Sequence, residues 1–200
     1  MGFAASNEDG WLIQFFGRDS VGHAVEVGAF DGVTGSNTLA LEHSGWKVLC
    51  VEPNPAMVAA LHEMRDLYWS GACSDFNGTA RFHINASQPP CYSSLRPTTD
   101  HPQWHPEPDD QWYEREVEVR TLDSLLDEFK FPGLDVLSID TEGTEMDVLH
   151  GIDLVRWKPR VIIVEAWDAD NPITPYLEKY GYRRVDRRLV NDIYTRDWTP

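Results

Sequence analysis

Three carboxylates lie at the ends of two successive apolar segments of the chain. Asp140 ends residues 134–140 (LDVLSID), Glu142 follows two positions later, and Glu165 ends residues 160–165 (RVIIVE). If both segments are neighbouring parallel strands, their carboxyl ends meet at the edge where open α/β sheets bind ligands. Carboxylates gathered there can take a proton from a hydroxyl or hold a magnesium ion through oxygen ligands.

Helix capping is an alternative explanation of the same residues. Asp140 or Thr141 can cap a helix expected at residues 145–151, and Glu142 and Glu145 favour the positive end of its dipole. Capping and catalysis can coexist, so both interpretations stay open. Glu165, taken alone, is equally typical of a solvated loop.

A glycine-rich turn follows the first apolar segment, residues 24–28. Gly28 and Gly32 permit a tight turn and let a ligand approach the backbone closely. Glu52 directly follows the next apolar segment, residues 47–51, and lies 24 residues past Gly28. A carboxylate at that position can accept hydrogen bonds from a ribose diol. The two features together indicate a cofactor that contains adenosine.

The charge of the turn distinguishes between adenosine cofactors. Phe30 stands where the dinucleotide fingerprint G-x-G-x-x-G requires its second glycine. A pyrophosphate would lose its close approach there and would be repelled by Glu26 and Asp31. The same carboxylates suit the ammonium and sulfonium of S-adenosylmethionine, so this cofactor is favoured over NAD. The alternative is an α/β protein whose first turn simply requires glycine.

Apolar segments alternate with segments of helical period along most of the chain. This alternation predicts βαβ units and a mostly parallel sheet. Strands are expected at residues 24–28, 47–51, 69–74, 80–84, 117–119, 134–140, 160–165, 182–186 and 193–196. Helices are expected at residues 36–44, 55–67, 122–129, 145–151 and 173–180. A short N-terminal helix with Trp11, Phe15 and Phe16 is expected to dock on the sheet, and an Asn191-Asp192 turn to close a C-terminal hairpin.

Residues 85–116 interrupt the alternation with six prolines and several aromatic residues. A segment of this kind predicts a lid-like insertion within a single domain of residues 1–200. His101 or His105 could serve as a general base, and Trp104, Trp112 and Tyr113 could stack on a sugar or exclude water. Solvated histidines and aromatic rings packed onto the domain explain the same residues.

Composition excludes several classes of partner. The chain of 200 residues carries a formal net charge of −16, which argues against a nucleic-acid backbone or an anionic membrane as the main partner. No apolar run approaches the roughly 20 residues needed to span a bilayer. Three cysteines match no zinc spacing and indicate reduced thiols in a cytoplasmic protein.

Five sequence blocks occur in an order and spacing that resemble the FkbM-type methyltransferases. They are EVGAFDGVTGSNTLALE, GWKVLCVEPNP, TLDSLL, LDVLSIDTEGTEMDVLHG and VIIVE, and they span about residues 25–165. The resemblance implies a Rossmann-like class I sheet of seven strands in the order 3-2-1-4-5-7-6, with strand 7 antiparallel and helices on both faces. It also implies S-adenosylmethionine-dependent methyl transfer to a hydroxyl of a small molecule, sugar or glycoside.

The same resemblance implies site residues. Those expected at the cofactor are Glu26, Gly28, Ala29, Phe30, Asp31, Gly32, Ser36, Asn37, Glu52, Pro53, Asn54, Ala72, Cys73, Ser74 and Asp140. Among them, Glu52 would hold the ribose, and residues 72–74 would touch the adenine edge. The candidate catalytic residues are Asp140, Glu142, Glu165, His101 and His105, of which the first three are also candidate ligands of Mg²⁺.

Two functions from different classes stay open. The first is an O-methyltransferase with a sugar-like small-molecule acceptor, in which residues 85–116 help to form the acceptor pocket. The second is a catalytically inactive cofactor-binding module that acts through a protein partner. The intact acidic block of residues 140–145 favours the enzyme. The sequence leaves the acceptor and the oligomeric state open.

Overall fold

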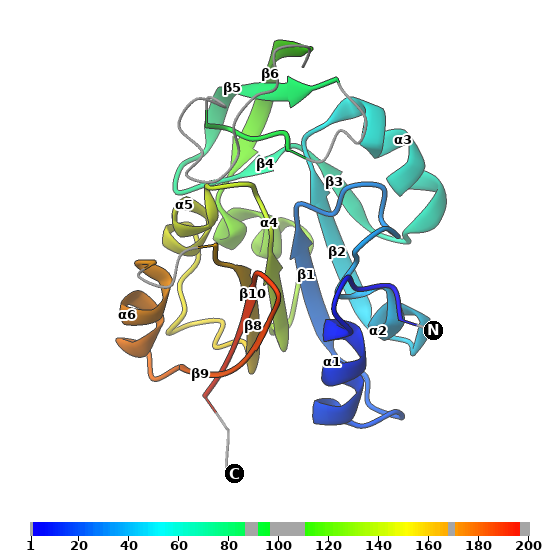
Figure 1. The fold of residues 1–200 in the computed structure, drawn as a ribbon, viewed down its shortest axis with the longest axis vertical. Helices are drawn as coiled ribbons and strands as arrows, with labels where there is room; N and C mark the ends of the chain where they lie inside the picture. Colours follow the sequence, from blue (N-terminus) through cyan, green and yellow to red (C-terminus); the bar gives the residue numbers. More distant parts are fainter. Residues whose placement is uncertain (1, 87–91, 97–110, 168–170, 197–200) are drawn as a thin grey trace.

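A seven-stranded mixed sheet forms the centre of the molecule (Figure 1). The computed structural model describes residues 2–86, 92–96, 111–167 and 171–196. The strands of this large sheet are β1 (His23–Val27), β2 (Lys47–Glu52), β3 (Tyr68–Ser70), β7 (Val136–Ile139), β8 (Val161–Glu165), β9 (Arg183–Arg188) and β10 (Asn191–Thr195). Their order is β3-β2-β1-β7-β8-β10-β9, and β10 runs antiparallel to both of its neighbours. The first five strands in that order pair in parallel.

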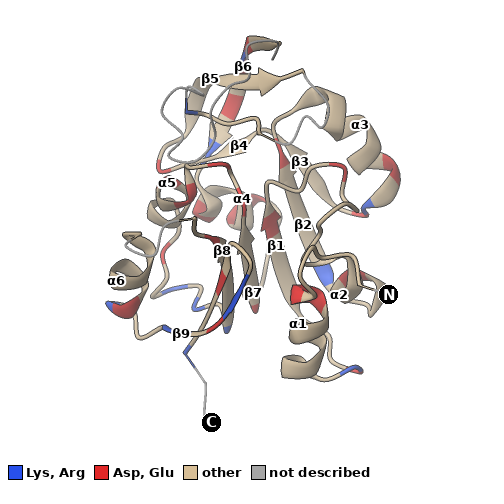
Figure 2. Ribbon diagram, in the orientation of Figure 1, with Lys and Arg blue, Asp and Glu red and all other residues tan. Residues whose placement is uncertain are grey.

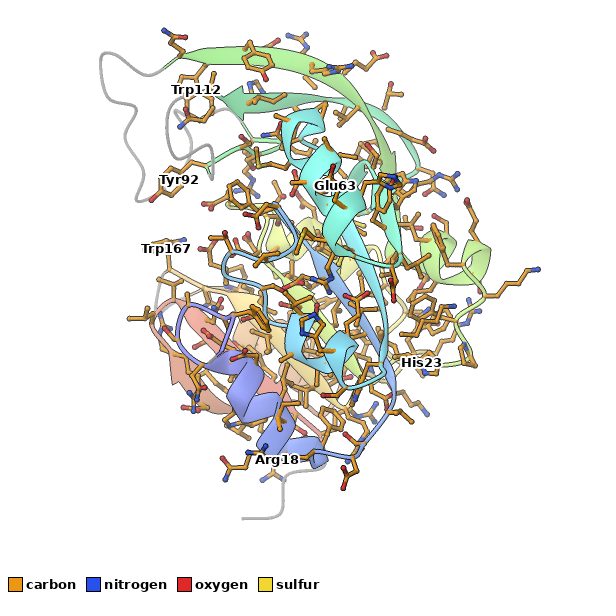
Figure 3. All side chains as sticks on the ribbon, turned by 90° about the vertical axis from the view of Figure 1, so that its right-hand side faces the viewer. Arg18, His23, Glu63, Tyr92, Trp112 and Trp167 are labelled. Atoms are coloured by element: carbon orange, nitrogen blue, oxygen red, sulfur yellow. The ribbon has the colours of Figure 1, made fainter. Side chains whose placement is uncertain are left out.

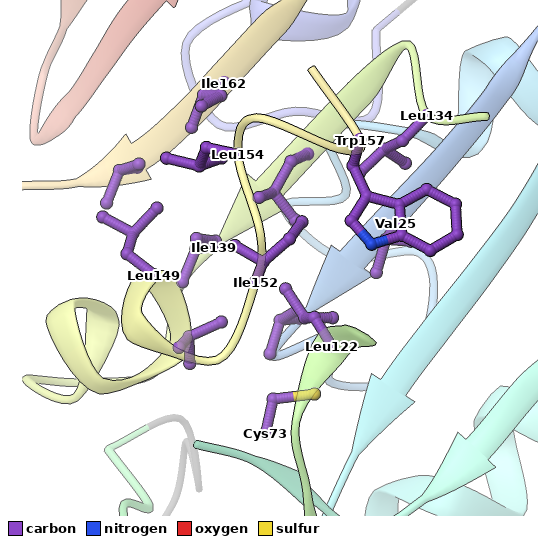
Figure 4. Close-up of a cluster of buried hydrophobic side chains, with 14 of the residues drawn as sticks. Val25, Cys73, Leu122, Leu134, Ile139, Leu149, Ile152, Leu154, Trp157 and Ile162 are labelled. Atoms are coloured by element: carbon purple, nitrogen blue, oxygen red, sulfur yellow. The ribbon is translucent and has the colours of Figure 1, made fainter. Parts of the chain in front are cut away.

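Helices cover both faces of the sheet, which confirms the mixed α/β class. They are α1 (Glu8–Phe16), α2 (Leu39–His43), α3 (Pro55–Met64), α4 (Leu122–Glu128), α5 (Glu145–His150) and α6 (Ile173–Glu178). One buried cluster joins the sheet to α4, α5 and α6, and another joins it to α1, α2 and α3. Figure 4 shows part of the first cluster, including Leu122 of α4 and Leu149 of α5. Successive residues of a strand alternate between these clusters, as Ala24 and Val25 of β1 do, because side chains along a strand point to opposite faces. None of the described helices is long and apolar enough to cross a bilayer.

A second, three-stranded sheet lies above the large one in Figure 1. It consists of β4 (Ala72–Cys73), β5 (Gly78–Asn85) and β6 (Trp112–Arg120) in the order β4-β6-β5. Its own apolar cluster contains Phe82, Ile84 and Val119. The sequence predicts strands in these regions but not that they form a separate sheet.

The ends of the expected insertion, residues 85–116, belong to this small sheet. Asn85 ends β5 and pairs with Trp112, where β6 begins. The antiparallel ladder therefore extends into residues 85–116, which were expected to lack strands. Backbone pairing between β5 and β6 continues past the apolar residues that predicted strands at 80–84 and 117–119. Residues 87–91 and 97–110, which include His101, Trp104 and His105, lie outside the described residues.

The N-terminal helix packs as expected. Trp11 stacks on Phe15 with ring centroids 5.1 Å apart, and Phe16 meets Trp46 edge-to-face at 4.8 Å. These rings adjoin the cluster that joins α1 to the sheet. The helix therefore contributes to the same core as the parallel strands.

The expected position of the C-terminal turn is wrong. The chain turns at residues 189–190, whereas Asn191 and Asp192 belong to β10 and are buried. The side chain of Asn191 donates to Glu8, and Asp192 pairs with Arg184 and Arg187. These partners explain why two residues typical of turns lie inside a strand.

Candidate active site

A cavity of about 320 Å³ lies between the small sheet and the carboxyl ends of β1, β2 and β7. Its volume is at the lower end of the range for small-molecule sites. Every residue expected at the cofactor lines this cavity except Asp31, Gly32 and Ser74. Further lining residues that the sequence analysis did not assign are Val27, Thr34, Gly35, Val51, Phe82, Ser93, Leu95, Ser138, Thr141 and Thr144.

Gly28 lets the loops after β1 and β7 approach each other. It has a φ of 82°, and a Cβ at this position would lie 1.6 Å from the carbonyl oxygen of Asp140. The N–H groups of Gly28 and Ala29 both donate to the carbonyl of Val51 at 3.0 Å. The glycine is therefore required by the packing of the turn as well as by its conformation.

Glu26 fixes the loop that follows the glycine turn. Its Oε2 accepts hydrogen bonds from the hydroxyls of Ser36 (2.7 Å) and Thr38 (2.6 Å), and its Oε1 accepts from the N–H of Asn37 (2.7 Å). Because these three residues are held in a loop, α2 begins only at Leu39 and not at residue 36. Glu26 is expected at the cofactor, and it lines the cavity, but both of its oxygens have protein partners.

Arg65, which was not among the residues predicted at the site, balances the charge of Glu26. Its guanidinium lies 3.1 Å from Glu26 and also binds Glu42 and the carbonyl of Gly32. Arg65 is buried and adopts an extended conformation, so α3 ends at Met64 and not at residue 67. Two acidic residues in apolar elements, Glu26 and Glu42, could have indicated a buried cation, because buried carboxylates need a partner of opposite charge.

Asp31 and Ser74 have structural roles outside the cavity lining. Asp31 accepts hydrogen bonds from the N–H groups of Val33 and Thr34 and from the Thr34 hydroxyl. Partial burial opposes its ionisation, but these hydrogen bonds outweigh burial and lower the pKa of Asp31. Ser74 is buried, and its N–H donates to the carbonyl of Arg120 at 3.1 Å.

Glu52 forms part of the cavity wall at the end of β2. Its Oε2 accepts from the N–H of Phe30 at 2.9 Å, and its Oε1 accepts from the N–H of Asn54 at 2.7 Å. Burial raises the pKa of Glu52 to about 7, although the two backbone hydrogen bonds oppose the rise. The carboxylate therefore changes its charge near neutral pH.

Asp140, Glu142 and Glu165 come together at the carboxyl ends of β7 and β8. One oxygen from each carboxylate can be chosen such that all three lie within 4.8 Å of one another. Asp140 and Glu142 line the cavity, and Glu165 lies beside them with 5 % of its surface exposed. Asp140 is exposed to the cavity, yet the surrounding walls leave its carboxylate poorly solvated. Burial, followed by repulsion from neighbouring carboxylates, raises the pKa of all three groups.

Capping of α5 does not account for Asp140 or Glu142. The N-cap residue of α5 is Thr144. Glu145, instead, accepts hydrogen bonds from the N–H groups of Thr141 (3.1 Å) and Gly143 (2.9 Å). Glu142 has a φ of 56°, a left-handed conformation that is uncommon for a residue with a side chain and recurs at functional sites.

Comparison with known proteins identifies the family. Residues 26–184 match the model of the methyltransferase FkbM domain. The chain belongs to the FkbM methyltransferase family. The matched span includes all of the cavity residues and Glu165. The resemblance noted in the sequence is thereby confirmed.

A curated relative is also named as a methyltransferase. The chain is 33% identical over 72 residues to methyltransferase sdnD of Sordaria araneosa. The match covers 32% of this chain and 27% of that protein, so the chain matches about a quarter of the relative's length.

In this FkbM-family chain, residues 92–96 join the small sheet to the loop after β7, which carries Asp140 and Glu142. The backbones of Ser94 and His83 exchange two hydrogen bonds, of 2.8 and 3.0 Å. The Ser94 hydroxyl donates to the carbonyl of Thr141 at 3.1 Å. Ser93 and Leu95, on either side, line the cavity. The segment therefore closes the cavity between β5 and the loop that carries Asp140.

Three aromatic residues lie on the same side of the molecule. Figure 3 shows Tyr92, Trp112 and Trp167 along one edge of that view. Tyr92 precedes cavity residue Ser93, and Trp167 follows Glu165 by two positions, with 36% of its surface exposed. Tyr113 of β6 is also exposed. Two of the three aromatic residues expected near an acceptor, Trp112 and Tyr113, lie within the described residues, and both belong to β6.

Proposed function

We propose that the chain is an S-adenosylmethionine-dependent O-methyltransferase that acts on a hydroxyl of a small molecule, with a sugar or glycoside favoured. The observation that carries this proposal is a single cavity, within the FkbM match, that joins Glu52 to Asp140 and Glu142. A wall that accepts hydrogen bonds from a ribose and an acidic end that faces an acceptor are the two parts that such a reaction requires.

The polar groups of the cavity fit this cofactor. Asn37 is 6% exposed, and its Nδ2 donates to the Ser138 hydroxyl at 3.0 Å. Its Oδ1 is buried and accepts no hydrogen bond from any described residue. A buried acceptor without a donor is costly, and a ligand ammonium would supply the donor. A phosphate would supply none, which favours S-adenosylmethionine over a dinucleotide.

Methyl transfer requires that three atoms be aligned and that one proton be removed. S-adenosylmethionine, when bound, supplies an electrophilic methyl group on a sulfonium. The acceptor oxygen bonds to the methyl carbon as the carbon–sulfur bond breaks, and the hydroxyl proton passes to a carboxylate. Asp140 and Glu142 are the cavity carboxylates that we assign to this step. The walls hold the reactants in place and limit the access of water.

A sugar-like acceptor is supported by the aromatic side chains near the acidic end of the cavity. Aromatic rings combine apolar faces with polar edges, and carboxylates accept hydrogen bonds from hydroxyls. Tyr92 and Trp167 lie next to the cavity segment and to Glu165, respectively. An acceptor that carries both an apolar face and hydroxyls matches this combination.

The proposal is tested by calorimetric titration of the chain with S-adenosylmethionine and, separately, with NAD. We expect S-adenosylmethionine to bind and NAD not to bind. Glu52→Ala is expected to weaken binding, whereas the control Glu63→Ala, on the exposed side of α3, is expected to leave it unchanged. Formation of S-adenosylhomocysteine is then measured across a panel of sugars and glycosides. Binding without turnover on any acceptor would favour the inactive module, and no binding would reject both functions.

A further inference from the structure

We infer that Asp140, Glu142 and Glu165 form a binding site for one divalent metal cation beside the acceptor end of the cavity. The inference rests on the proposed function for the use of the metal, but not for its binding. The three residues come from the ends of β7 and β8 and from the loop that follows β7. Glu165 is the last residue of β8, and Asp140 and Glu142 directly follow the neighbouring parallel strand β7, so two adjacent strands position all three carboxylates.

The spacing of the oxygens suits a cation bound by carboxylates. The three oxygens lie within 4.8 Å of one another. Two oxygens bound to one calcium ion, each at about 2.3–2.6 Å, can be up to about 5 Å apart. Magnesium, at about 2.0–2.1 Å, requires a separation no larger than about 4.2 Å, so its binding needs the carboxylates to close slightly. A separation of at most 4.8 Å is therefore compatible with one divalent cation bound by all three carboxylates once they close around it, and the closure needed is smaller for Ca²⁺ than for Mg²⁺.

A buried oxygen gives a second and independent indication of a ligand. Oε2 of Glu165 is buried and has no hydrogen-bond partner among the described residues. Leaving a carboxylate oxygen buried without a donor or a cation is strongly unfavourable. A metal ion held jointly with Asp140 would supply the missing partner.

Charge balance at the cluster points the same way. Among the described residues, no lysine or arginine forms an ion pair with Asp140 or Glu165. The nearby Arg187 donates to the carbonyl of Ala166 at 2.7 Å but pairs with Asp192. By contrast, buried Glu26 has Arg65. Within the described ranges, a cation therefore accompanies buried Glu26, whereas none accompanies Asp140 or Glu165.

A metal at this point would act on the acceptor. Asp140 and Glu142 face the cavity, so open coordination positions would face it too. A hydroxyl bound to a divalent cation loses its proton more readily, which is the step that methyl transfer to an aliphatic hydroxyl requires.

The test uses Mn²⁺ as a paramagnetic probe of the full chain. The chain is first treated with a chelator, and binding is followed by the loss of the free Mn²⁺ signal in electron paramagnetic resonance. We expect one bound Mn²⁺ per chain, which Ca²⁺ and Mg²⁺ displace. Glu165→Gln and Glu142→Gln are each expected to weaken binding by about tenfold or more, because each removes one charged ligand.

The acidic surface requires a matched control. Glu178→Gln, on the exposed side of α6, changes the net charge by the same amount and is expected to leave binding unchanged. Circular dichroism and S-adenosylmethionine binding show whether each variant is folded. Equal Mn²⁺ affinity in the wild type and in both folded cluster variants, or no saturable binding, would overturn the inference. Absence of saturable Mn²⁺ binding would mean that the carboxylates share protons with one another instead of binding a metal ion. Retained S-adenosylmethionine binding would then leave the proposed function intact.

Discussion

In the proposed function, Asp140 lies where the cofactor and the acceptor would meet. It directly follows β7, faces the cavity, and has its backbone carbonyl against Gly28. Its side chain faces the cavity and is the group that the proposal assigns to the acceptor, while its backbone helps to shape the glycine turn that lines the same cavity. These two roles are separable by substitution, because only the first depends on the charge of the carboxylate.

We expect Asp140→Asn to lower turnover by about 100-fold or more, the range typical of a lost general base. Cofactor affinity should change little, because asparagine preserves the shape and the backbone. Initial rates of S-adenosylhomocysteine formation and calorimetry measure the two quantities. Asp75→Asn, at an exposed position, is the control. Full activity of Asp140→Asn would remove the residue from the mechanism.

Glu52 predicts a pH dependence of cofactor binding. Burial raises its pKa to about 7, and only the ionised carboxylate offers all its lone pairs to a ribose diol. Affinity should therefore rise as pH increases from about 6 to about 8, and change by about tenfold per unit well below the pKa. The suitable ligand is 5′-methylthioadenosine, because it has the ribose but no titrating amino-acid part.

The matched variant for this prediction is Glu52→Gln. It should bind the nucleoside more weakly and with an affinity independent of pH over the same interval. Fluorescence or calorimetric titration at a series of pH values provides the comparison. A flat profile for the wild type would show that Glu52 does not bind the ribose through its charge.

Arg65 connects three elements through one buried guanidinium. It binds Glu26 of β1, Glu42 of α2 and the carbonyl of Gly32 in the intervening loop. Without it, two carboxylates would remain buried without a cation. The loop that lines the cavity would lose a support at the same time.

We expect Arg65→Ala to lower the free energy of unfolding by about 3–5 kcal/mol, the range for breaking a buried ion pair from one side. Urea denaturation measures this change. Arg18→Ala, exposed after α1 (Figure 3), should stay within about 0.5 kcal/mol of the wild type. A loss for Arg65→Ala no larger than that of the control would show that the buried network contributes little.

Gly28 sets how closely β1 and β7 approach at their carboxyl ends. A methyl group there would overlap the Asp140 carbonyl at 1.6 Å, and alanine would also be strained at a φ of 82°. We expect Gly28→Ala to unfold at a clearly lower urea concentration and to bind S-adenosylmethionine weakly. Gly133→Ala is the control, because a Cβ there meets nothing within 4 Å. Wild-type stability of Gly28→Ala would mean that the two loops can separate freely.

At the scale of the whole molecule, net charge opposes compactness. The formal net charge is −16, and every helix carries at least one acidic residue (Figure 2). Like charges distributed over a small globule repel one another and destabilise the compact state. Salt screens this repulsion, and its range is about 10 Å at 0.1 M.

We therefore expect the melting temperature to rise between about 0.02 M and about 0.3 M sodium chloride, as screening weakens the repulsion. Exposed ion pairs such as Arg156–Asp127 weaken too, but each contributes little to stability. Differential scanning fluorimetry gives the trend, and potassium chloride serves as a control for effects specific to one ion. A melting temperature that falls with either salt would show that specific ion pairs dominate over net repulsion.

The central strands, the family and most residues that line the cavity could be predicted from the amino-acid sequence. Apolar segments ended by Gly28, Glu52, Asp140 and Glu165 specify β1, β2, β7 and β8, because the periodicity of a strand is a local property. Parallel pairing then brings the residues that follow these strands to one edge. That is why motifs far apart in the chain could be assigned to a single site before any contact was known.

The partners of several groups far apart in the chain follow only from the packing of the fold. Arg65 meets Glu26 across 39 positions of sequence, β5 and β6 extend their ladder to Asn85 and Trp112, and Asn191 leaves the expected turn to bind Glu8. None of these contacts leaves a periodic pattern in the chain. Each is selected because a buried charge, N–H or carbonyl must find a partner, and the packing of the whole fold decides which partner lies within reach.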